Sequence, residues 1–397
     1  MILAALAWAG ARTCAAQTSA EEFRGVLLKE AAFTAEEFSA LERGEVVVKT
    51  LPATGKSEVA FCGVVRLRGD PAQSLAAFGQ SLTQSNRRVM PGGRVGAPPA
   101  PEEFQSLTLD NDDVEDMKRC AAGDCDLKMS APMIDRLHKE VDWAAPAYRA
   151  SAERFFRLML FDYARDYLAR GDAALAASDG RAGAARPDEG RRTSCGSLPY
   201  LEDSAPEFAA YLQDFPRLEL PGVENALHWS KIKIGLKPVV LLTHTATYTR
   251  RRDGAPQILV VTKQLYATRY FDSSLSLTLL TSVAAADGAQ PGTYLLYANR
   301  SRAGALGGLL GGLKRRLAAE TALEGLREIL QRARLNAEPR PAGETGPGVR
   351  ADGEGGGTRP WTDWLSRRAS YFFLALSLVA SILLLWLRRR DLKARGT

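Results

Sequence analysis

Histidine is scarce in this chain of 397 residues. The three histidines, His138, His228 and His244, are too few and too scattered for most metal or acid–base sites. The sequence also contains no HExxH, GxSxG or GxxxxGK motif, the patterns of zinc peptidases, serine hydrolases and phosphate-binding loops. The acidic stretch LDNDDVEDM lacks the glycine and glutamate spacing of an EF-hand calcium loop. The sequence therefore names no catalytic residue, no metal ligand and no cofactor.

The net charge of the chain is also small. The 52 lysines and arginines exceed the 46 acidic residues by only six, while the apolar fraction of 46% is normal for a globular protein. No basic stripe with interleaved aromatic residues is present, so we do not expect nucleic-acid binding. Five basic residues lie in the last ten positions, directly after an apolar run. A basic cluster in that place points to lipid headgroups.

The longest uncharged run of the chain lies near its C-terminus, at 369–387. About 20 apolar residues are needed for a helix to cross a bilayer. Trp361 and Tyr371 before or at the start of the run, and Trp386 at its end, resemble the aromatic belts of membrane helices. We predict a transmembrane helix at 369–387 and a basic cytoplasmic tail at 388–397. The alternative is a buried core helix, although three arginines seldom follow such a helix directly.

The first residues, 1–16, resemble a secretory signal peptide. An apolar run at 2–11 precedes the small residues Cys14-Ala15-Ala16. The positive residues that usually begin such a signal are missing, so a start further upstream or an N-terminal helix of the fold are the alternatives. Together, the signal and the C-terminal helix predict a single-pass protein of the inner (plasma) membrane. Its folded part is expected in the periplasm.

Cysteine is sparse, with five residues. Removal of the signal peptide would remove Cys14. It would leave an even number, Cys62, Cys120, Cys125 and Cys195. An even number in an oxidising compartment indicates disulfides, and the short spacing of Cys120 and Cys125 around Gly123 predicts that these two pair. Free thiols, or a metal site that includes His138, are the alternatives.

Two stretches rich in glycine, proline and charge divide the chain. Residues 337–360 have no apolar period and are predicted to form a disordered linker. Residues 178–191 are interpreted as a flexible loop within the folded domain. The remaining chain comprises an N-terminal segment at 17–40 and one folded domain at 41–336.

Strand patterns in this domain come in two groups. Two strands are expected at 44–51 and 57–69, and five at 228–237, 239–251, 257–270, 274–285 and 293–300. Turn residues separate them at distances typical of antiparallel neighbours. In the strand at 274–285, Leu275, Leu277 and Leu279 alternate with serine and threonine, which indicates one buried face. We therefore predict a curved antiparallel sheet of about seven strands.

Helical patterns occupy the rest of the domain. A helical insert is expected at 113–216, and a long amphipathic helix from about Arg302 to Asn336 follows the last strand. Its predicted apolar stripe consists of leucines, namely Leu306, Leu310, Leu313, Leu317, Leu326 and Leu330. The pairs Gly307/Gly311 and Gly308/Gly312 indicate close packing. Contact of this apolar segment with a membrane is the alternative.

The order of elements predicts an α+β domain in which the final helix covers the sheet. This order resembles the START-like, or helix-grip, superfamily of domains that bind lipids and other hydrophobic molecules. The residues that carry the resemblance are the opening strands Glu45–Arg68, the strand series Trp229–Arg300 and the helix after it. It spans Leu41–Asn336 and rests on element order, and the insert at 113–216 is larger than the family usually carries.

The resemblance implies a cavity between the sheet and the final helix that holds an apolar ligand. Its candidate lining residues are His244, Tyr248, Tyr266, Leu275, Leu277, Leu279 and Tyr297. For the tyrosines and the histidine, ordinary cross-strand pairing is the alternative. Lys263 is interpreted as a solvated strand residue.

The sequence as a whole favours a non-catalytic, membrane-anchored domain outside the cytoplasm that binds a lipid or other hydrophobic ligand. Two alternatives stay open. One is a protein-interaction module of the cell envelope, in which the helical insert docks a partner protein. The other is an enzyme that uses a START-like cavity.

Overall fold

A computed structural model describes residues 21–85, 89–175, 199–234, 237–283, 292–308 and 310–338. The predicted signal peptide, the flexible loop at 178–191, the linker beyond residue 338, the transmembrane helix and the basic tail lie outside the described residues. Within the described ranges, none of the helices combines the length and the apolar character that a membrane crossing requires.

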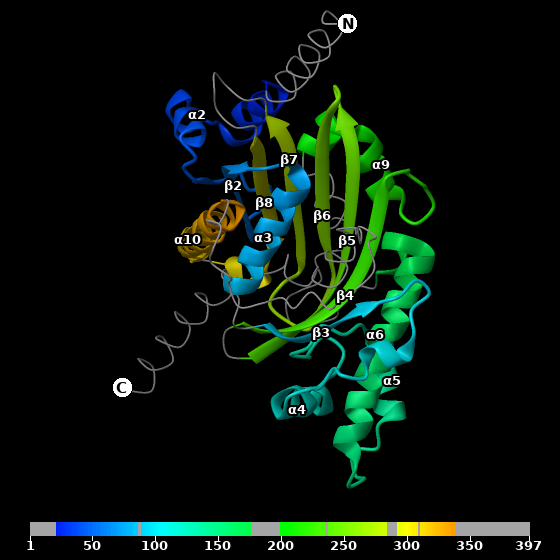
Figure 1. The fold of residues 1–397 in the computed structure, drawn as a ribbon. Helices are drawn as coiled ribbons and strands as arrows, with labels where there is room; N and C mark the ends of the chain where they lie inside the picture. The colour runs from blue at the N-terminus through cyan, green and yellow to red at the C-terminus, as the bar shows by residue number, and fades with distance from the viewer. Residues whose placement is uncertain are drawn as a thin grey trace, which may run out of the picture.

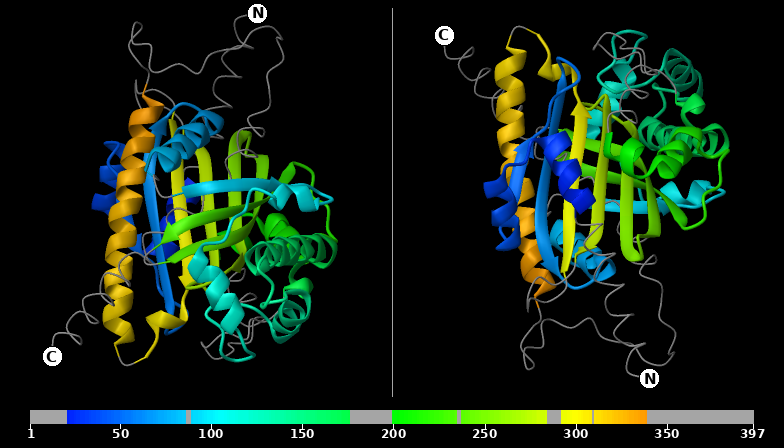
Figure 2. Two further views of the ribbon diagram at one scale, coloured as in Figure 1. Left: turned by 90° about the horizontal axis from the view of Figure 1, so that it is seen from below. Right: turned by 90° about the horizontal axis from the view of Figure 1, so that it is seen from above.

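One curved antiparallel sheet of eight strands forms the centre of the molecule, as Figures 1 and 2 show. The strand order is β1-β2-β8-β7-β6-β5-β4-β3. The strands are β1 (Val47–Thr50), β2 (Glu58–Arg68), β3 (Val89–Val95), β4 (Val223–Ile234), β5 (Lys237–Arg252), β6 (Ala255–Ala267), β7 (Ser273–Val283) and β8 (Gly292–Arg302). The α+β class and the curved antiparallel sheet are confirmed.

The sequence pattern did not predict the eighth strand, β3, because Pro91 and two glycines interrupt it. It lies at the edge of the sheet and pairs with β4, with a register shift between Val89 and Gly92. An edge strand tolerates proline, which lacks an amide hydrogen. Gly93 is needed because a Cβ there would lie 2.4 Å from Nε1 of Trp229. Tertiary pairing with β4 therefore overrides the weak strand propensity of this segment.

Helices cover both faces of the sheet. On the first, here called the α10 face, lie α3 (Pro71–Ser85) and α10 (Gly311–Ala337). On the second, the α6 face, lie the helical segment 21–31, α2 (Ala35–Glu42), α6 (Tyr148–Arg170), α8 (Pro199–Ser204) and α9 (Pro206–Asp214). Helices α4 (Asn111–Arg119) and α5 (Ala131–Glu140) pack around α6, and 3₁₀ turns occupy Pro101–Phe104, Gly171–Ala174 and Gly304–Leu306. Figure 2 shows α10 along one side of the molecule.

The final helix crosses β2 at very short range. Leu326 and Leu330 are buried against Gly63 of β2, where an added Cβ would lie 2.7 Å from a methyl carbon of each leucine. Only glycine leaves room for these two side chains, and any larger residue would force α10 away from the sheet. A long C-terminal helix that packs on the sheet is thus confirmed.

The predicted leucine stripe of this helix is only partly buried. The helix begins at Gly311 and not near Arg302, after the turn at 304–306. Leu310 and Leu313 are 46% and 41% exposed, because the first turn of α10 does not lie against the sheet.

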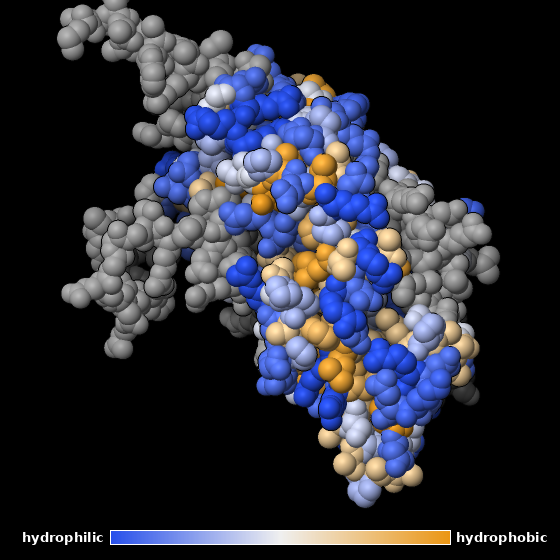
Figure 3. Space-filling view, turned by 90° about the vertical axis from the view of Figure 1, so that its right-hand side faces the viewer, coloured by the Kyte–Doolittle hydropathy of each residue, from blue (hydrophilic) through white to orange (hydrophobic). Residues whose placement is uncertain are grey.

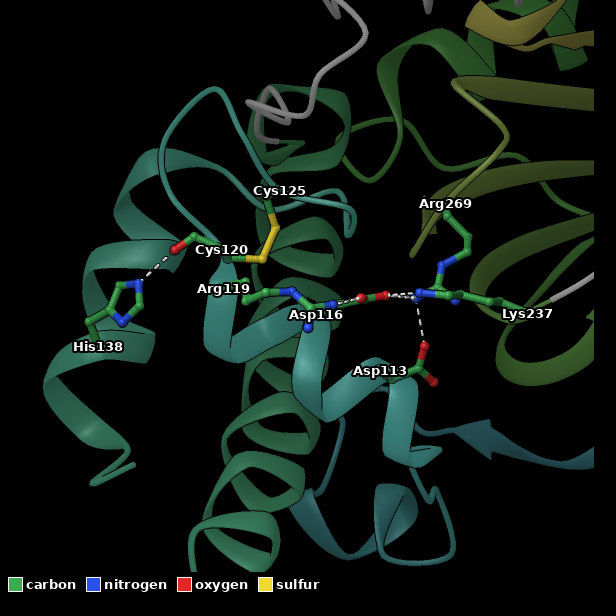
Figure 4. Close-up of a disulfide and its surroundings, with 8 residues drawn as sticks. All are labelled: Asp113, Asp116, Arg119, Cys120, Cys125, His138, Lys237 and Arg269. Carbon is green, nitrogen blue, oxygen red and sulfur yellow. Dashed lines mark hydrogen bonds and ion pairs between the residues drawn. A yellow bond between two sulfur atoms is a disulfide. The ribbon is translucent and has the colours of Figure 1, made fainter. Parts of the chain in front are cut away.

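Two buried carboxylates anchor the helical insert to the sheet, as Figure 4 shows. Asp113 and Asp116 of α4 both face Arg269, which follows β6, at 2.6 and 3.4 Å from its Nη2. Lys237 at the start of β5 reaches Asp116 at 2.5 Å, and Arg119 contacts its other oxygen at 2.8 Å. Buried carboxylates are tolerated only when cations and hydrogen bonds compensate their lost hydration. This cluster therefore fixes α4 against the ends of β5 and β6.

A disulfide closes the loop directly after α4. The sulfur atoms of Cys120 and Cys125 lie 1.94 Å apart, in agreement with the pairing expected from their spacing. The carbonyl oxygen of Cys120 lies 2.7 Å from Nε2 of His138, so the loop is also joined to α5 (Figure 4). Cys62 is a free, buried thiol, and Cys14 and Cys195 lie outside the described residues.

Replacing Arg269 with methionine is expected to lower the free energy of unfolding by about 3–5 kcal/mol, because Asp113 would stay buried without its cation. Urea unfolding followed by circular dichroism measures the change. Arg316→Met is the control, since Arg316 and Glu320 form an exposed pair at 3.6 Å whose loss is worth at most about 1 kcal/mol. Equal effects of the two substitutions would contradict this view of the cluster.

Candidate ligand-binding site

The structure separates the seven predicted ligand-site residues between the two faces of the sheet. Six lie on the α6 face, namely His244, Tyr248, Tyr266, Leu275, Leu277 and Leu279. Tyr297 lies on the α10 face, where its ring centre is 5.9 Å from that of Phe78 in α3. Alternate residues of a strand point to opposite faces. The three leucines therefore point away from α10.

The six residues on the α6 face lie beneath different helices. The ring of Tyr266 packs against Tyr163 of α6 with 5.6 Å between ring centres. Tyr248 packs against Phe208 of α9 at 5.2 Å. Leu277 lies beneath the helical segment 21–31. The α6 face is thus one continuous surface with several covers.

His244 lies at the centre of a buried chain of hydrogen bonds. Its Nε2 is 2.8 Å from Oδ1 of Asn225, and its Nδ1 is 2.8 Å from the hydroxyl of Tyr167. Nδ2 of Asn225 donates to the hydroxyl of Tyr211 at 2.7 Å. Because Oδ1 of Asn225 can only accept, Nε2 of His244 carries the proton and Nδ1 accepts from Tyr167. Each ring nitrogen of His244 therefore has a partner.

The surroundings of His244 keep its ring neutral. Burial lowers the pKa of His244 to about 3, and the nearby Lys263 cation contributes in the same direction. The ring of Phe215 lies 4.5 Å from the imidazole and excludes water from one side. A neutral histidine whose N–H donates to Asn225 and whose other ring nitrogen accepts from Tyr167 has no readily released proton and no free lone pair at neutral pH. The geometry therefore gives His244 a structural role.

Lys263 is paired and not a free amine. Its Nζ contacts Oδ1 of Asp172, and it lies 5.9 Å from the ring centre of Tyr167. Its side chain is largely buried, which differs from the solvated strand lysine predicted from the sequence. The ion pair ties the turn after α6 to β6, beside the His244 chain.

A cavity of about 40 Å³ lies on the α6 face between the helical segment 21–31 and the sheet. Its floor consists of Cys62, Leu277, Leu296 and Ala298 from β2, β7 and β8, and its roof includes Val26, Leu27 and Ala31. A water molecule needs roughly 10–15 Å³ of such space. In this conformation the cavity therefore has room for a few water molecules and not for an acyl chain.

Two charged side chains, Arg300 and Glu30, contribute to the lining of this otherwise mostly apolar cavity. Glu30 is partly exposed, and its carboxylate lies 3.8 Å from Nζ of Lys29, which partly offsets its charge. Arg300 of β8 is 8% exposed, and its Nη1 donates to the carbonyl of Pro52 at 2.9 Å. Glu58 lies 3.5 Å from the same nitrogen but also accepts from the amide and hydroxyl of Thr54. Nε of Arg300 has no hydrogen-bond partner among the described residues. A buried donor without a partner is costly, by about 1–3 kcal/mol or more when charged.

Burial suppresses the ionisation of the cavity's thiol and of its phenol. Burial raises the pKa of the Cys62 thiol to about 12, so it stays protonated and unreactive. Burial also raises the pKa of the Tyr200 phenol. Within the described ranges, no three histidine, cysteine or carboxylate side chains are grouped to hold a metal ion.

Sequence reasoning missed the roof of this cavity and Arg300. The predicted domain began at residue 41, yet Phe23 and Leu27 are buried against the sheet. Their spacing of four, continued by Ala31, is the period of one helix face. That period was a usable signal for a helix at 21–31. No signal marked Arg300, because its position relative to the cavity depends on strand pairing.

No family model, no curated protein and no solved structure matches this chain. The site is therefore interpreted from its own geometry.

The depressed pKa of His244 predicts a specific pH dependence of stability. Unfolded histidine takes up a proton near pH 6.5, whereas folded His244 does so only near pH 3. The stabilising contribution is thus present above about pH 6.5 and is lost as the pH falls, at up to about 1.4 kcal/mol per pH unit. Urea unfolding should show wild type losing about 2–3 kcal/mol more than His244→Gln between about pH 7 and pH 4.5. If wild type and His244→Gln lost the same free energy of unfolding over this pH range, the burial of a neutral His244 would be contradicted.

Proposed function

We propose that this domain binds an amphiphile, an apolar molecule with an anionic end, between the helical segment 21–31 and the sheet. The observation that carries the proposal is Arg300, a buried cation with an unsatisfied donor in the lining of a mostly apolar cavity. Leucine and alanine side chains would receive the apolar body. The guanidinium would receive a carboxylate or phosphate, for which its planar donors are well suited.

Binding requires segment 21–31 to move outward, because the cavity is small. The segment is held at its rim by the exposed ion pair Arg24–Glu42 at 2.8 Å and the half-buried pair Glu22–Arg252 at 2.9 Å. Exposed pairs contribute about 0–1 kcal/mol each. The stronger contact is Phe23, whose ring stacks on Tyr294 with 5.0 Å between centres. An apolar ligand replaces part of this buried surface when the segment moves.

The proposal keeps the ligand class that the START-like resemblance implies, but places the ligand elsewhere. A long helix on a curved sheet supports the resemblance. The resemblance implies a cavity on the α10 face, whereas the cavity described here lies on the opposite face. Anchoring by a helix at 369–387 and a location outside the cytoplasm belong to the same proposal and rest on the sequence features described above.

The test compares decanoate with decanol, which share an apolar chain and differ in charge. Native mass spectrometry of the detergent-extracted full chain should detect one bound decanoate and weaker decanol binding. Arg300→Met should weaken decanoate binding roughly ten- to a hundredfold, the loss of one charged hydrogen bond of about 1.5–3 kcal/mol, and leave decanol binding unchanged.

Arg250→Met is the matched control. Arg250 is also largely buried on the α6 face, where it pairs with Glu207 at 2.5 Å, but it does not line the cavity. This variant should bind decanoate as wild type does. Absence of decanoate binding, or equal losses in the two variants, would refute the proposed site. Recovery of an empty chain with a defined protein partner would favour the interaction-module alternative.

A further inference from the structure

The start of α10 exposes apolar side chains that packing does not use. Leu310 and Leu313 are 46% and 41% exposed, and Ala305 before them also lies in solvent. A side chain added at Gly308 or Gly312 would meet no atom within 4 Å. Further along, the helix buries its apolar side chains, including Leu326 and Leu330. The exposed leucines thus belong to one end of the helix, and residues 304–308 and 310–316 with the turn 52–57 are here called the α10 tip.

Basic residues lie close to these leucines, both in the same helix and in the turn between β1 and β2. Lys314, Arg315 and Arg316 follow Leu313 directly, and Arg315 Nη1 donates to the carbonyl of Lys56 in the turn between β1 and β2. Lys56 is exposed. The α10 tip therefore combines two exposed leucines with four basic residues from two adjacent segments, of which Lys56 and Arg316 are exposed and Lys314 and Arg315 are half-buried.

Among the described residues near the α10 tip, acidic side chains are few and are mostly paired elsewhere. Arg316 lies 3.6 Å from Glu320, but both side chains are more than half exposed, so the pairing is weak. Asp272 on the neighbouring turn pairs with Lys128. Glu58 at the start of β2 is buried and lies 3.5 Å from Arg300. The surface of the α10 tip thus keeps a positive excess.

The stability of α10 explains these cations only in part, because Lys314 and Arg315 donate to the backbone carbonyls of Ala305 and Lys56, whereas Arg316 pairs only weakly with the exposed Glu320. The first turn contains no acidic residue, and basic residues near the start of a helix oppose its dipole by about 0.3–1 kcal/mol each. Exposed leucines likewise contribute nothing to the core. Leucines beside clustered lysine and arginine are the combination that binds anionic bilayers, in which apolar side chains enter the headgroup boundary and cations meet lipid phosphates.

We propose that the α10 tip docks on the surface of an anionic lipid bilayer. Each cation near such a surface contributes about 1 kcal/mol, and the leucines add apolar burial. The chain beyond the described residues fits this partner, because the apolar run at 369–387 is predicted to cross a membrane. Thirty residues, 339–368, separate it from α10 and span up to roughly 100 Å when extended. Since α10 is only about 40 Å long, the tip remains within reach of the bilayer.

A fluorescent label at the α10 tip tests the proposal directly. The full chain carrying Leu313→Cys, labelled with the environment-sensitive dye NBD, is reconstituted into vesicles of phosphatidylcholine alone or mixed equally with phosphatidylglycerol. In the mixed vesicles, the emission at position 313 should shift to the blue and be quenched by nitroxide-bearing lipids. The labelled unsubstituted chain supplies the background from native cysteines.

Leu335→Cys is the matched control. Leu335 lies near the other end of the same helix and is 61% exposed, so its label should report water in both vesicles. Lys56→Ser with Arg316→Ser should abolish the blue shift at position 313 while circular dichroism stays unchanged. A label at 313 that behaves like the label at 335 overturns the proposal. Insertion that depends neither on phosphatidylglycerol nor on the two cations overturns the assignment of an anionic surface.

Discussion

Strands β2, β6, β7 and β8 are buried along nearly their whole length on both faces, and the remaining elements are placed by the need to cover them. In β7, Leu275, Leu277 and Leu279 point to the α6 face while Leu280 points to the α10 face. Removing such surface from water is the main favourable term in folding, and one layer of helices can cover only one face. The fold therefore needs α3 and α10 on one side and the helical insert with segment 21–31 on the other. Figure 3 shows that the outer surface of the insert side is mainly hydrophilic, with hydrophobic residues in separate small patches.

The covers differ in how firmly they are held. Around the insert, Asp113 and Asp116 are buried with Arg269, and His244 is locked between Tyr167 and Asn225. Such buried networks are costly to break, so they make this half of the α6 face rigid. Segment 21–31 is held by the apolar packing of Phe23, Leu27 and Ala31 and by ion pairs near the surface, without a buried polar network. The cavity with Arg300 thus lies beneath the more easily displaced cover, as a binding site that must open requires.

Much of the fold could be predicted because its signals are local. Apolar or alternating runs separated by turn residues predicted seven strands, and the spacing of Cys120 and Cys125 predicted their disulfide. The edge strand β3 was missed because Pro91 and its glycines have low strand propensity, and only its pairing with β4 makes it a strand. The site was harder to predict. Because these strands are apolar on both faces, their sequences do not show that the side chains of Tyr297 and Leu277 point to opposite faces of the sheet. Strand pairing alone brings Arg300, Cys62 and Leu277 together.

Backbone hydrogen exchange measured by mass spectrometry tests the central claim, that a displaceable segment 21–31 covers an amphiphile site. Without ligand, the amides of 21–31 should exchange faster than those of α10. Decanoate should slow exchange in 21–31 and leave α6 unchanged, because the cavity is lined by the segment, the sheet and Tyr200 of α8 but by no residue of α6. Exchange in 21–31 as slow as in α10, and unaffected by decanoate, would contradict the account.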